Sequence, residues 1–590
     1  MRTKNLAPDR HSPLLTRRRF VTGATVGGAL LALGVDASDS AELQPNPAPR
    51  ILTGNRFELT IGFQPVNFTG RKRFATAING TVPGPIIRWR QGERVSLRVK
   101  NNLAEDSSIH WHGIVLPPGM DGVPGISFDG IQPGETFEYE IDVRQSGTYW
   151  YHSHSGFQEQ TGLYGALVID PIEPEPFSYD RDYVVVLSDW SDEDPEHIYA
   201  TLKKLSHYYN FRERTAGDVW RDIEREGVKN TWRARAMWNQ MRMSDRDISD
   251  VTGYTYTFLM NGQTPAQGWQ GLFKRGEKVR LRIINGAAMS FFDVRIPGLK
   301  MTVVAADGQY IQPVTVDEFR IGVAETYDVI VEPQADVAYT IFAQAMDRTG
   351  YARGTLTPDP GLTAPIPDMD PAPILTHADM GMGMAMSAGM EHDHAAMDHS
   401  QMDHDVPTRP AKAGLGSNQP VEHRDTEDGP QVDMRAADPQ FRLDDPGVGL
   451  RNNGRRVLTY ADLRHLHATP DPRDPSREVQ LHLTGNMSRY MWSINGVRFA
   501  DAEPLALKFG ERLRITFVND TMMNHPMHMH GIWSDLETGD GAHIPRKHTV
   551  VVQPGAKISY LMTADALGEW AYHCHLLYHM PGMFRKVVIS

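Results

Sequence analysis

The sequence predicts an all-β protein of three Greek-key β-sandwiches in tandem. One segment occurs three times, as AINGTVPGPIIRWRQGERVSLRVKNN (77–102), LMNGQTPAQGWQGLFKRGEKVRLRIING (259–286) and SINGVRFADAEPLALKFGERLRITFVND (493–520). Each copy has an Asn-Gly turn, a spacer, and a Gly-Glu pair followed by apolar residues at every second position, which is typical of a strand with one buried face. Further strands follow between Gly and Pro turns, as in QPGETFEYEIDV (132–143) and QPGAKISYLMT (553–563), and this spacing favours sandwiches. The alternating residues are Val95, Leu97, Val99, Val279, Leu281, Ile283, Leu513, Ile515 and Phe517.

The amino terminus predicts an export signal over residues 1–37. The stretch TRRRFVTGATVGGALLALGVDA (16–37) places arginines before a short apolar run and resembles a twin-arginine signal peptide, which implies a folded protein delivered to the periplasm. The apolar part, Phe20 to Val35, is shorter than the roughly 20 residues that span a bilayer. We therefore expect no stable membrane anchor.

The length and the net charge of the chain limit the number of domains and the kinds of partner. A chain of 590 residues is long enough for three or four domains, and a net charge of -13 without a basic stretch excludes a nucleic-acid partner. We expect a monomer. The predicted domains are 50–172, 180–357 and 452–590, with a helical insertion at about 196–243 and a Met/His-rich linker at 358–451.

The insertion and the linker depart from the strand pattern in different ways. Helical spacing indicates a helix through Ile198, Leu202, Leu205 and Tyr209. The linker consists largely of Pro, Gly, Asp, Met and His, a composition that supplies no packed core and indicates a flexible loop.

Four histidine motifs predict metal sites in the first and third modules. They are His110-Trp-His112, His152-Ser-His154, the run His525-Pro-Met-His528-Met-His530, and His573-Cys574-His575 with His579. Residues two apart on a strand face the same side, so each HxH pair presents two imidazoles together. Cys574, the one cysteine of the chain, then faces away from His573 and His575 and requires a separate metal. A thiolate with two imidazoles and a weak thioether is the ligand set of a blue-copper electron-transfer site.

These motifs resemble the three-domain multicopper oxidases, over nearly all of the chain after the signal. The resemblance implies cupredoxin-like domains and four copper ions per chain. A type 1 copper would lie on His525, Cys574, His579 and an axial Met583, and a type 2 copper on His110 and His528. One type 3 copper would lie on His112, His152 and His575, and the other on His154, His530 and His573. Module two, with AYTIFAQAMD (338–347) where the other modules have YWYHSH and WAYHCH, is then a spacer without ligands.

Two positions depart from the family pattern. The axial methionine of the family usually comes ten residues after the cysteine, where this chain has Phe584; Met583 is favoured, and Met580 is the alternative. Many relatives place a proton-delivering carboxylate near the HCH loop, but Leu576, Leu577 and Tyr578 cannot serve. Asp121, in MDG, matches the acidic residue that the family has near the type 2 site and is the candidate proton relay.

The signal, the DRDYVVVLSDWSDEDPE segment (180–196), the insertion and the Met/His tract resemble the bacterial copper-resistance oxidases of the CopA type. The implied reaction is one-electron oxidation of a donor coupled to four-electron reduction of O2 to water. Thioethers suit Cu(I), so Cu(I) is the expected donor, with small phenols as further reductants. The tract comprises Met380, Met382, Met384, Met386, Met390, His392, His394, Met397, His399, Met402 and His404.

Alternatives to this function and to these methionine roles stay open. A plain linker is the alternative role of the tract, and Met522, Met523, Met527 and Met529 are interpreted as packing residues rather than a second Cu(I) site. A periplasmic protein that sequesters copper without turnover is the rival function. A copper nitrite reductase is disfavoured, because such an enzyme needs neither the flanking HCH ligands nor three sandwiches.

Overall fold

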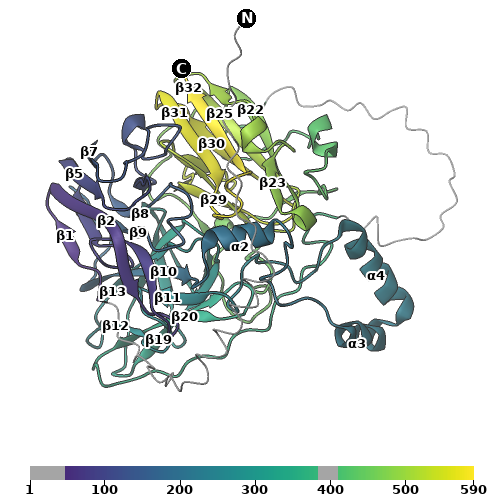
Figure 1. The fold of residues 1–590 in the computed structure, drawn as a ribbon, viewed down its shortest axis with the longest axis horizontal. Coiled ribbons are helices and arrows are strands. Elements are labelled where there is room, and N and C mark those ends of the chain that lie inside the picture. Colours follow the sequence, from purple (N-terminus) through teal and green to yellow (C-terminus); the bar gives the residue numbers. More distant parts are fainter. Residues whose placement is uncertain (1–46, 383–409) are drawn as a thin grey trace, which may run out of the picture. The chain divides into compact units, whose positions relative to one another are not determined.

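The computed structural model describes residues 47–382 and 410–590 and confirms the predicted fold class, three tandem β-sandwiches with a helical insertion (Figure 1). The signal segment 1–37 and most of the Met/His tract lie outside the described residues. Within the described ranges, no helix combines the length and the apolar character needed to cross a membrane.

The repeated Asn-Gly pairs form the same turn in each module. Asn79-Gly80, Asn261-Gly262 and Asn495-Gly496 all have positive φ at both residues, and an antiparallel bridge closes each turn. Positive φ at both central residues defines the type I′ turn, whose twist matches that of paired strands. The repeat seen in the sequence is therefore a structural repeat, and each module contains the same tight turn.

In module one, two sheets enclose the core. The first sheet has the order β3 (Arg73–Ile78), β2 (Arg56–Val66), β5 (Arg94–Asn101) and β7 (Thr136–Asp142). The second has the order β1 (Ile51–Thr53), β4 (Ile86–Arg90), β9 (Tyr164–Asp170), β8 (Gly147–His152) and β6 (His110–His112). Because β6 pairs with β8 and places His110 opposite His152, two of the histidine motifs become neighbours.

Module two has a six-stranded and a five-stranded sheet. The six strands are, in order, β11 (Thr257–Met260), β10 (Arg181–Trp190), β13 (Val279–Asn285), β18 (Thr326–Val331), β15 (Met301–Ala306) and β16 (Gln309–Val316). The five strands are β12 (Trp269–Leu272), β20 (Tyr351–Thr357), β19 (Tyr339–Ala345), β14 (Phe292–Arg295) and β17 (Glu318–Ile321).

Module three repeats this arrangement and carries the other two histidine motifs. One sheet has the order β23 (Met491–Ile494), β22 (Arg477–Asn486), β25 (Arg512–Asn519), β30 (Ala556–Thr563), β27 (Ser534–Leu536) and β28 (Arg546–Lys547), with β21 (Gln440–Phe441) also paired to β30. The other has the order β24 (Leu505–Leu507), β32 (Phe584–Ile589), β31 (Gly568–Cys574), β26 (His525–Met529) and β29 (Thr549–Val552). The pairing of β26 with β31 brings the last two motifs side by side.

The expectation of one buried face holds for β5 but is wrong for β13 and β25. Every residue of these two strands is buried, including the arginines between the apolar positions. Arg282 Nε donates to Asp182 Oδ1 at 2.7 Å, and Arg514 Nε donates to Glu537 Oε2 at 2.6 Å. The outer face of each strand is covered by other parts of the chain, and acidic partners balance its charges.

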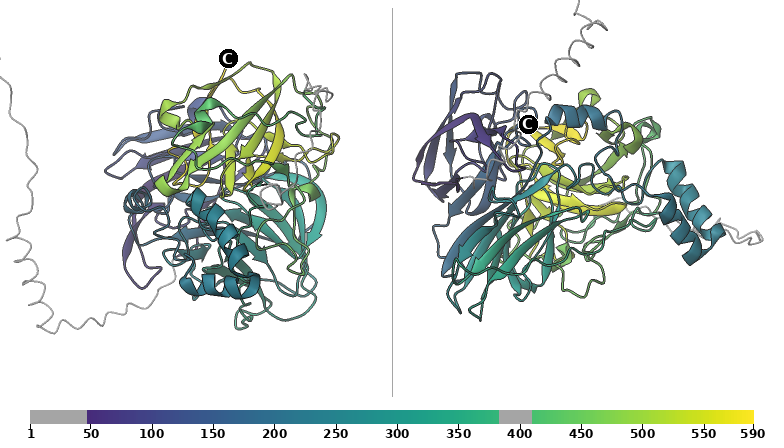
Figure 2. Two further views of the ribbon diagram at one scale, coloured as in Figure 1. Left: turned by 90° about the vertical axis from the view of Figure 1, so that its right-hand side faces the viewer. Right: turned by 60° about the horizontal axis from the view of Figure 1, so that its bottom comes forward.

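The helical insertion is present, but its first helix is shorter than the spacing predicted. α2 (Pro195–Leu202) begins at the N-cap Asp194 and buries Ile198 and Leu202, whereas Leu205 lies beyond its end and is 44% exposed. Tyr209 is buried from a non-helical segment and bonds Glu193 through its hydroxyl. Figure 2 shows α3 (Ala216–Glu226) and α4 (Val228–Met241) side by side. The 3-10 helices are η1 (Pro118–Met120), η3 (Asp425–Asp428), η4 (Tyr460–Asp462), η5 (Met487–Arg489) and η6 (Phe499–Asp501).

The described parts of the linker 358–451 are packed, contrary to the expectation from composition. Met380 is fully buried, and a Cβ on Gly555 would lie 2.1 Å from the Met380 carbonyl carbon. On the far side of the undescribed stretch, the carbonyl oxygens of Ala411 and Lys412 accept hydrogen bonds from Arg514. Both arms therefore pack on module three, and Met380 belongs to the core rather than to a flexible array.

Candidate metal centre

The thiol of Cys574 and two imidazoles converge in module three. Cys574 Sγ lies 3.5 Å from His525 Nδ1 and 3.9 Å from His579 Nδ1, and the two nitrogens are 3.3 Å apart. All three side chains are fully buried. One sulfur and two nitrogens at these distances can all reach a single metal ion, and they are the donors that a blue-copper site uses.

Strand alternation separates Cys574 from the histidine before it. In the pairing of β31 with β26, Cys574 lies opposite Met527, and His573 lies opposite His528. Cys574 points toward His525 and His579, while His573 Nε2 lies 3.0 Å from His530 Nε2 on the other side. Consecutive residues of one strand thus serve two different groups of ligands.

The rings around Cys574 are held by partners on their outer nitrogens. His579 Nε2 lies 2.7 Å from Asp250 Oδ2, and His525 Nε2 lies 2.7 Å from the hydroxyl of Thr521. Trp492 stacks on His579 with ring centroids 3.8 Å apart. These contacts leave both Nδ1 atoms directed at the thiol. Burial raises the pKa of the Cys574 thiol, so a thiolate forms there only with a cation beside it.

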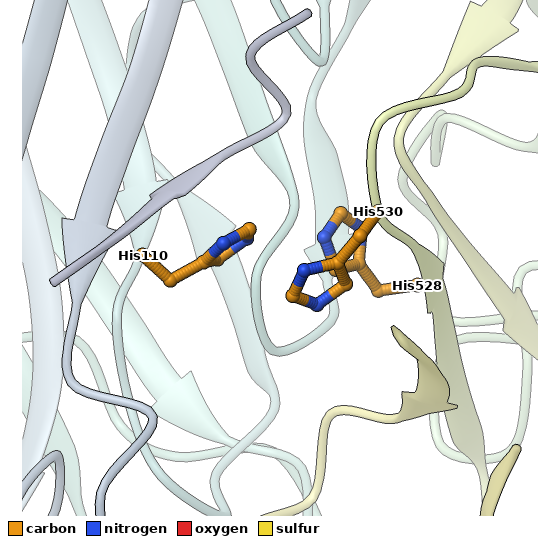
Figure 3. A group of neighbouring side chains, drawn as sticks. All are labelled: His110, His528 and His530. Atoms are coloured by element: carbon orange, nitrogen blue, oxygen red, sulfur yellow. The ribbon is translucent and has the colours of Figure 1, made fainter. Parts of the chain in front are cut away.

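The other eight predicted histidines meet between modules one and three. Figure 3 shows His110 from module one facing His528 and His530 from module three. The potential ligand atoms form groups in which all lie within 4.8 Å of one another: His110, His528 and His530; His112, His152 and His575; and His154, His530 and His573. Residues more than 400 positions apart in the chain thus share one buried pocket.

This pocket fits metal ions because eight of its ring nitrogens have no other partner in the part of the chain that the structure describes. Among the described residues, no hydrogen-bond partner exists for Nε2 of His110, His152, His154 and His528, or for either ring nitrogen of His112 and His575. A buried polar atom without a partner destabilises the fold by about 1–3 kcal/mol. Burial, with repulsion from neighbouring imidazoles, lowers the pKa of His112, His152, His528 and His575 well below the usual value. The rings are therefore neutral and can donate lone pairs to metal.

Asp121 contacts two rings of this pocket from outside. Its Oδ2 lies 2.8 Å from His530 Nδ1, and its backbone oxygen lies 2.8 Å from His110 Nδ1. The side chain is fully buried. Gly122 permits this approach, because a Cβ there would lie 1.9 Å from the carbonyl oxygen of Ile109. The geometry orients His110 and His530 with their Nε2 atoms inward.

Sequence reasoning missed a second carboxylate, Glu159. Its Oε2 lies 2.6 Å from His152 Nδ1, and its side chain is buried. Burial, together with the nearby Asp189, raises the pKa of Glu159 well above the usual value. A signal was present, because Glu159 follows His154 at the distance at which Met580 follows His575. The search for a carboxylate was confined to the HCH loop and did not extend to the equivalent loop of module one.

The two axial candidates lie in different surroundings. Met583 is fully buried, and its backbone oxygen accepts the amide hydrogen bond of Cys574 at 3.0 Å. Met580 is partly buried and packs against Val123, Ala571 and Phe584. Of the tract, Met382 is partly buried on the core, and the members from Met384 to His404 lie outside the described residues.

Module two contributes contacts to the centre although its strand β19 carries no histidine. Asp250 lies in this module and contacts His579, and Asp307 Oδ2 accepts the backbone amides of His548 and Thr549 in module three. The interpretation of module two as a spacer is therefore incomplete, since it supplies outer partners in place of ligands.

Comparison with known sequences identifies relatives along the whole chain. Family models described as multicopper oxidase match residues 60–174, 181–360 and 472–590. Copper resistance protein A of Escherichia coli is 56% identical, over 98% of this chain and 99% of its own length. Copper resistance protein A of Pseudomonas syringae pv. tomato is 55% identical over the same shares.

Solved structures support the fold. Fet3p, a multicopper oxidase that functions in iron import, superimposes with a TM-score of 0.61 at 17% identity and covers 91% of this chain and 90% of its own. The laccase from Botrytis aclada gives a TM-score of 0.60 at 22% identity, covering 92% and 89%. At these identities the likeness concerns the arrangement of the sandwiches.

Proposed function

The chain belongs to the multicopper oxidase family and resembles its copper-resistance protein A type, and on that premise we propose that it oxidises Cu(I) with O2 as the acceptor. Small phenols are further donors. The observation that carries the proposal is the joint position of Cys574, between His525 and His579 in space and between His573 and His575 in sequence.

The proposed ligands follow from the groups of converging nitrogens. A type 1 copper is assigned to His525, Cys574 and His579, with Met583 as the axial ligand because Met583 is fully buried and its backbone oxygen bonds the amide of Cys574. The other three coppers are assigned to the shared pocket: type 2 on His110 and His528, one type 3 on His112, His152 and His575, and the other type 3 on His154, His530 and His573. When bound, copper supplies the redox chemistry, in which four electrons taken singly from the donor and four protons convert one O2 to two waters.

The chain connects the two sites through its backbone. One peptide unit on each side joins Cys574 to His573 and His575, so the thiol and two rings of the shared pocket are linked by covalent bonds. Seven of the eight rings are buried and His154 is partly exposed, so the protein keeps most of the pocket from bulk water. Asp121 is proposed to hold a proton beside His530, because its carboxylate contacts the outer nitrogen of that ring.

A cavity beside Asp250 supports Cu(I) as the donor. Met289, Met346 and Met523 line it together with Asp250, whose carboxylate bonds His579. Thioethers are soft ligands that suit Cu(I), and a carboxylate adds negative charge. A Cu(I) ion held here would be separated from His579 by one hydrogen-bonded side chain, that of Asp250. The Met/His tract would raise the local supply of the same ion.

Export through the twin-arginine pathway to the periplasm and a monomeric state complete the proposal. The export proposal rests on the sequence, because the arginine-rich start implies export of a folded, metal-loaded chain. Protection from copper follows from the reaction, because oxidation removes the membrane-permeant Cu(I).

Metal analysis and oxygen uptake test the proposal. We expect about four coppers per chain, an intense blue thiolate-to-copper absorption band, and oxygen consumption with Cu(I) or a phenol. Cys574→Ser should remove the blue band and turnover and leave the fold intact. A sequestering protein would bind copper without consuming oxygen, and full activity in Cys574→Ser would contradict the assignment.

A further inference from the structure

A ninth imidazole, that of His548, lies on the wall of the shared pocket. It is the residue between β28 and β29, and its side chain is 1% exposed. Ring centroids lie 4.7 Å apart for His548 and His112, and 6.0 Å apart for His548 and His528. Ligand atoms of these three histidines all lie within 4.8 Å of one another.

The ring of His548 presents an unpartnered nitrogen to this pocket. Nδ1 lies 3.1 Å from the Thr549 hydroxyl and 3.6 Å from Asp307 Oδ2. Nε2 is buried and has no hydrogen-bond partner among the described residues. A donor hydrogen on Nδ1, directed at these oxygens, leaves the lone pair on Nε2.

Neighbouring residues leave space for the ring of His548 and hold it in place. Gly113, directly after the HWH motif, leaves the space that the ring fills, because a Cβ there would lie 2.4 Å from His548 Cδ2. The backbone oxygen of His548 lies 2.6 Å from His528 Nδ1 and so orients that ring as well. Asp307 is buried against Lys547 at 3.0 Å and fixes the backbone of His548 through its amide. His548 is thus held from both sides rather than merely filling space.

Coordination numbers indicate which ion this nitrogen serves. In the proposed function, on which this inference rests, each type 3 copper has three imidazoles and the type 2 copper has two, from His110 and His528. The type 2 ion thus has the fewest proposed imidazoles. His548 shares its group with His112 and His528; His112 already belongs to a type 3 copper with three imidazoles, which leaves the ion of His528. We propose that His548 Nε2 is a third imidazole ligand of the type 2 copper, and that Asp307 of module two is its positioning residue.

Pulsed electron paramagnetic resonance of the copper-loaded wild type tests this without a variant. The type 2 signal should show coupling to three imidazoles. Coupling to two imidazoles would overturn the inference and leave the oxidase proposal standing. A loaded protein with no type 2 signal and no oxygen uptake would overturn the proposed function, and this inference with it.

His548→Gln gives a second readout, with His543→Gln as the matched control. We expect His548→Gln to hold type 2 copper at least roughly tenfold more weakly and to change the type 2 hyperfine splitting, while the blue band of the type 1 copper stays unchanged. His543 lies in the same segment but contacts backbone oxygens of His465 and His467, so its variant should retain every signal. Unchanged type 2 copper in His548→Gln would overturn the proposal. If the variant loses the blue band as well, it is misfolded, and the number of imidazoles coupled to the type 2 copper of the wild type decides whether the proposal stands.

Discussion

Single carboxylates behind the imidazoles set the geometry of the centre. Asp121 contacts His530, Glu159 contacts His152, and Asp250 contacts His579, each within 2.8 Å of the outer nitrogen. Such partners fix which nitrogen carries the proton and raise the basicity of the ring. The HxH spacing reveals ligands because it is local, and Asp121 and Glu159 lie close enough to the motifs in sequence to be sought there. Asp250 comes from module two, far from either motif of its partner ring, so spacing alone does not find it.

Glu159→Gln should weaken copper binding at the His152 position. The amide keeps the shape but cannot ionise behind the ring when a metal ion binds there, and loss of such a partner typically weakens metal affinity by roughly 10–100-fold. Copper retention during dialysis against a graded chelator measures this, and the blue band should persist. Glu196→Gln, on the exposed start of α2, is the control. Equal retention in both variants would leave Glu159 without a role in metal binding.

Asp250→Asn should raise the potential of the type 1 copper. Removing the negative charge 2.7 Å from His579 Nε2 makes the ring a weaker donor to Cu(II), and a tenfold change in the one-electron equilibrium is about 59 mV. A redox titration of the blue band records the shift. Tyr490→Phe removes the other hydrogen bond to Asp250 Oδ2 without changing charge and should shift the potential less. A lowered potential in Asp250→Asn would contradict this account.

At the scale of elements, β13 and β25 show what a strand pattern omits. The period of two identified both strands, but the polar positions between the apolar ones are buried too. Arg282 reaches Asp182 in β10 and the hydroxyl of Thr148 in β8, so its surroundings include module one. The alternation of apolar residues therefore predicts which face of a strand is buried in its own sandwich, but it does not show whether other parts of the chain cover the opposite face. The early end of α2 has a similar cause, because Tyr209 is buried by tertiary contact rather than by helical periodicity.

Asp182→Asn should destabilise the contact between modules one and two. Burial raises the pKa of Asp182, but Arg282, Arg280 and Arg88 outweigh it and lower the net pKa. Removing one partner of a buried ion pair reduces the free energy of unfolding by about 3–5 kcal/mol. Because the folded-state pKa is depressed, this stability is complete above the unfolded-state pKa of about 4 and is lost as pH falls through the folded value.

Urea unfolding of the copper-free protein between neutral and acid pH measures the free energy of unfolding that the ion pair of Asp182 contributes. The wild type and Asp182→Asn should differ by a constant amount near neutrality and converge below about pH 4. Asp142→Asn is the control, since Asp142 makes a 3.8 Å surface pair with Arg94 that contributes little. A gap that widens on acidification would refute the assignment of the pair.

For the whole molecule, sequence predicted the sandwiches and proposed ten histidines and one cysteine as ligands, but not how module two takes part. Repeats and HxH spacing are encoded within short segments, which is why both could be recognised. The outer partners Asp250 and Asp307 lie in loops whose neighbours are set by packing between modules. The packed arms of the linker were missed for the same reason, since composition does not report burial against another module.

Copper removal should destabilise modules one and three together. A ligand bound only by the folded state adds about 2.7 kcal/mol to stability when its free concentration is a hundred times its dissociation constant. Calorimetry of the loaded and chelated protein should show the loaded form unfolding at higher temperature. Identical transitions would mean that the shared pocket holds no copper in solution.

The pocket between modules one and three can form only after both modules have been synthesised. His110 is translated long before His575, and neither module one nor module three holds the full set of rings. A product that ends before His575 would therefore lack part of the proposed copper pocket. Copper binding in this pocket thus has to wait for the synthesis of module three.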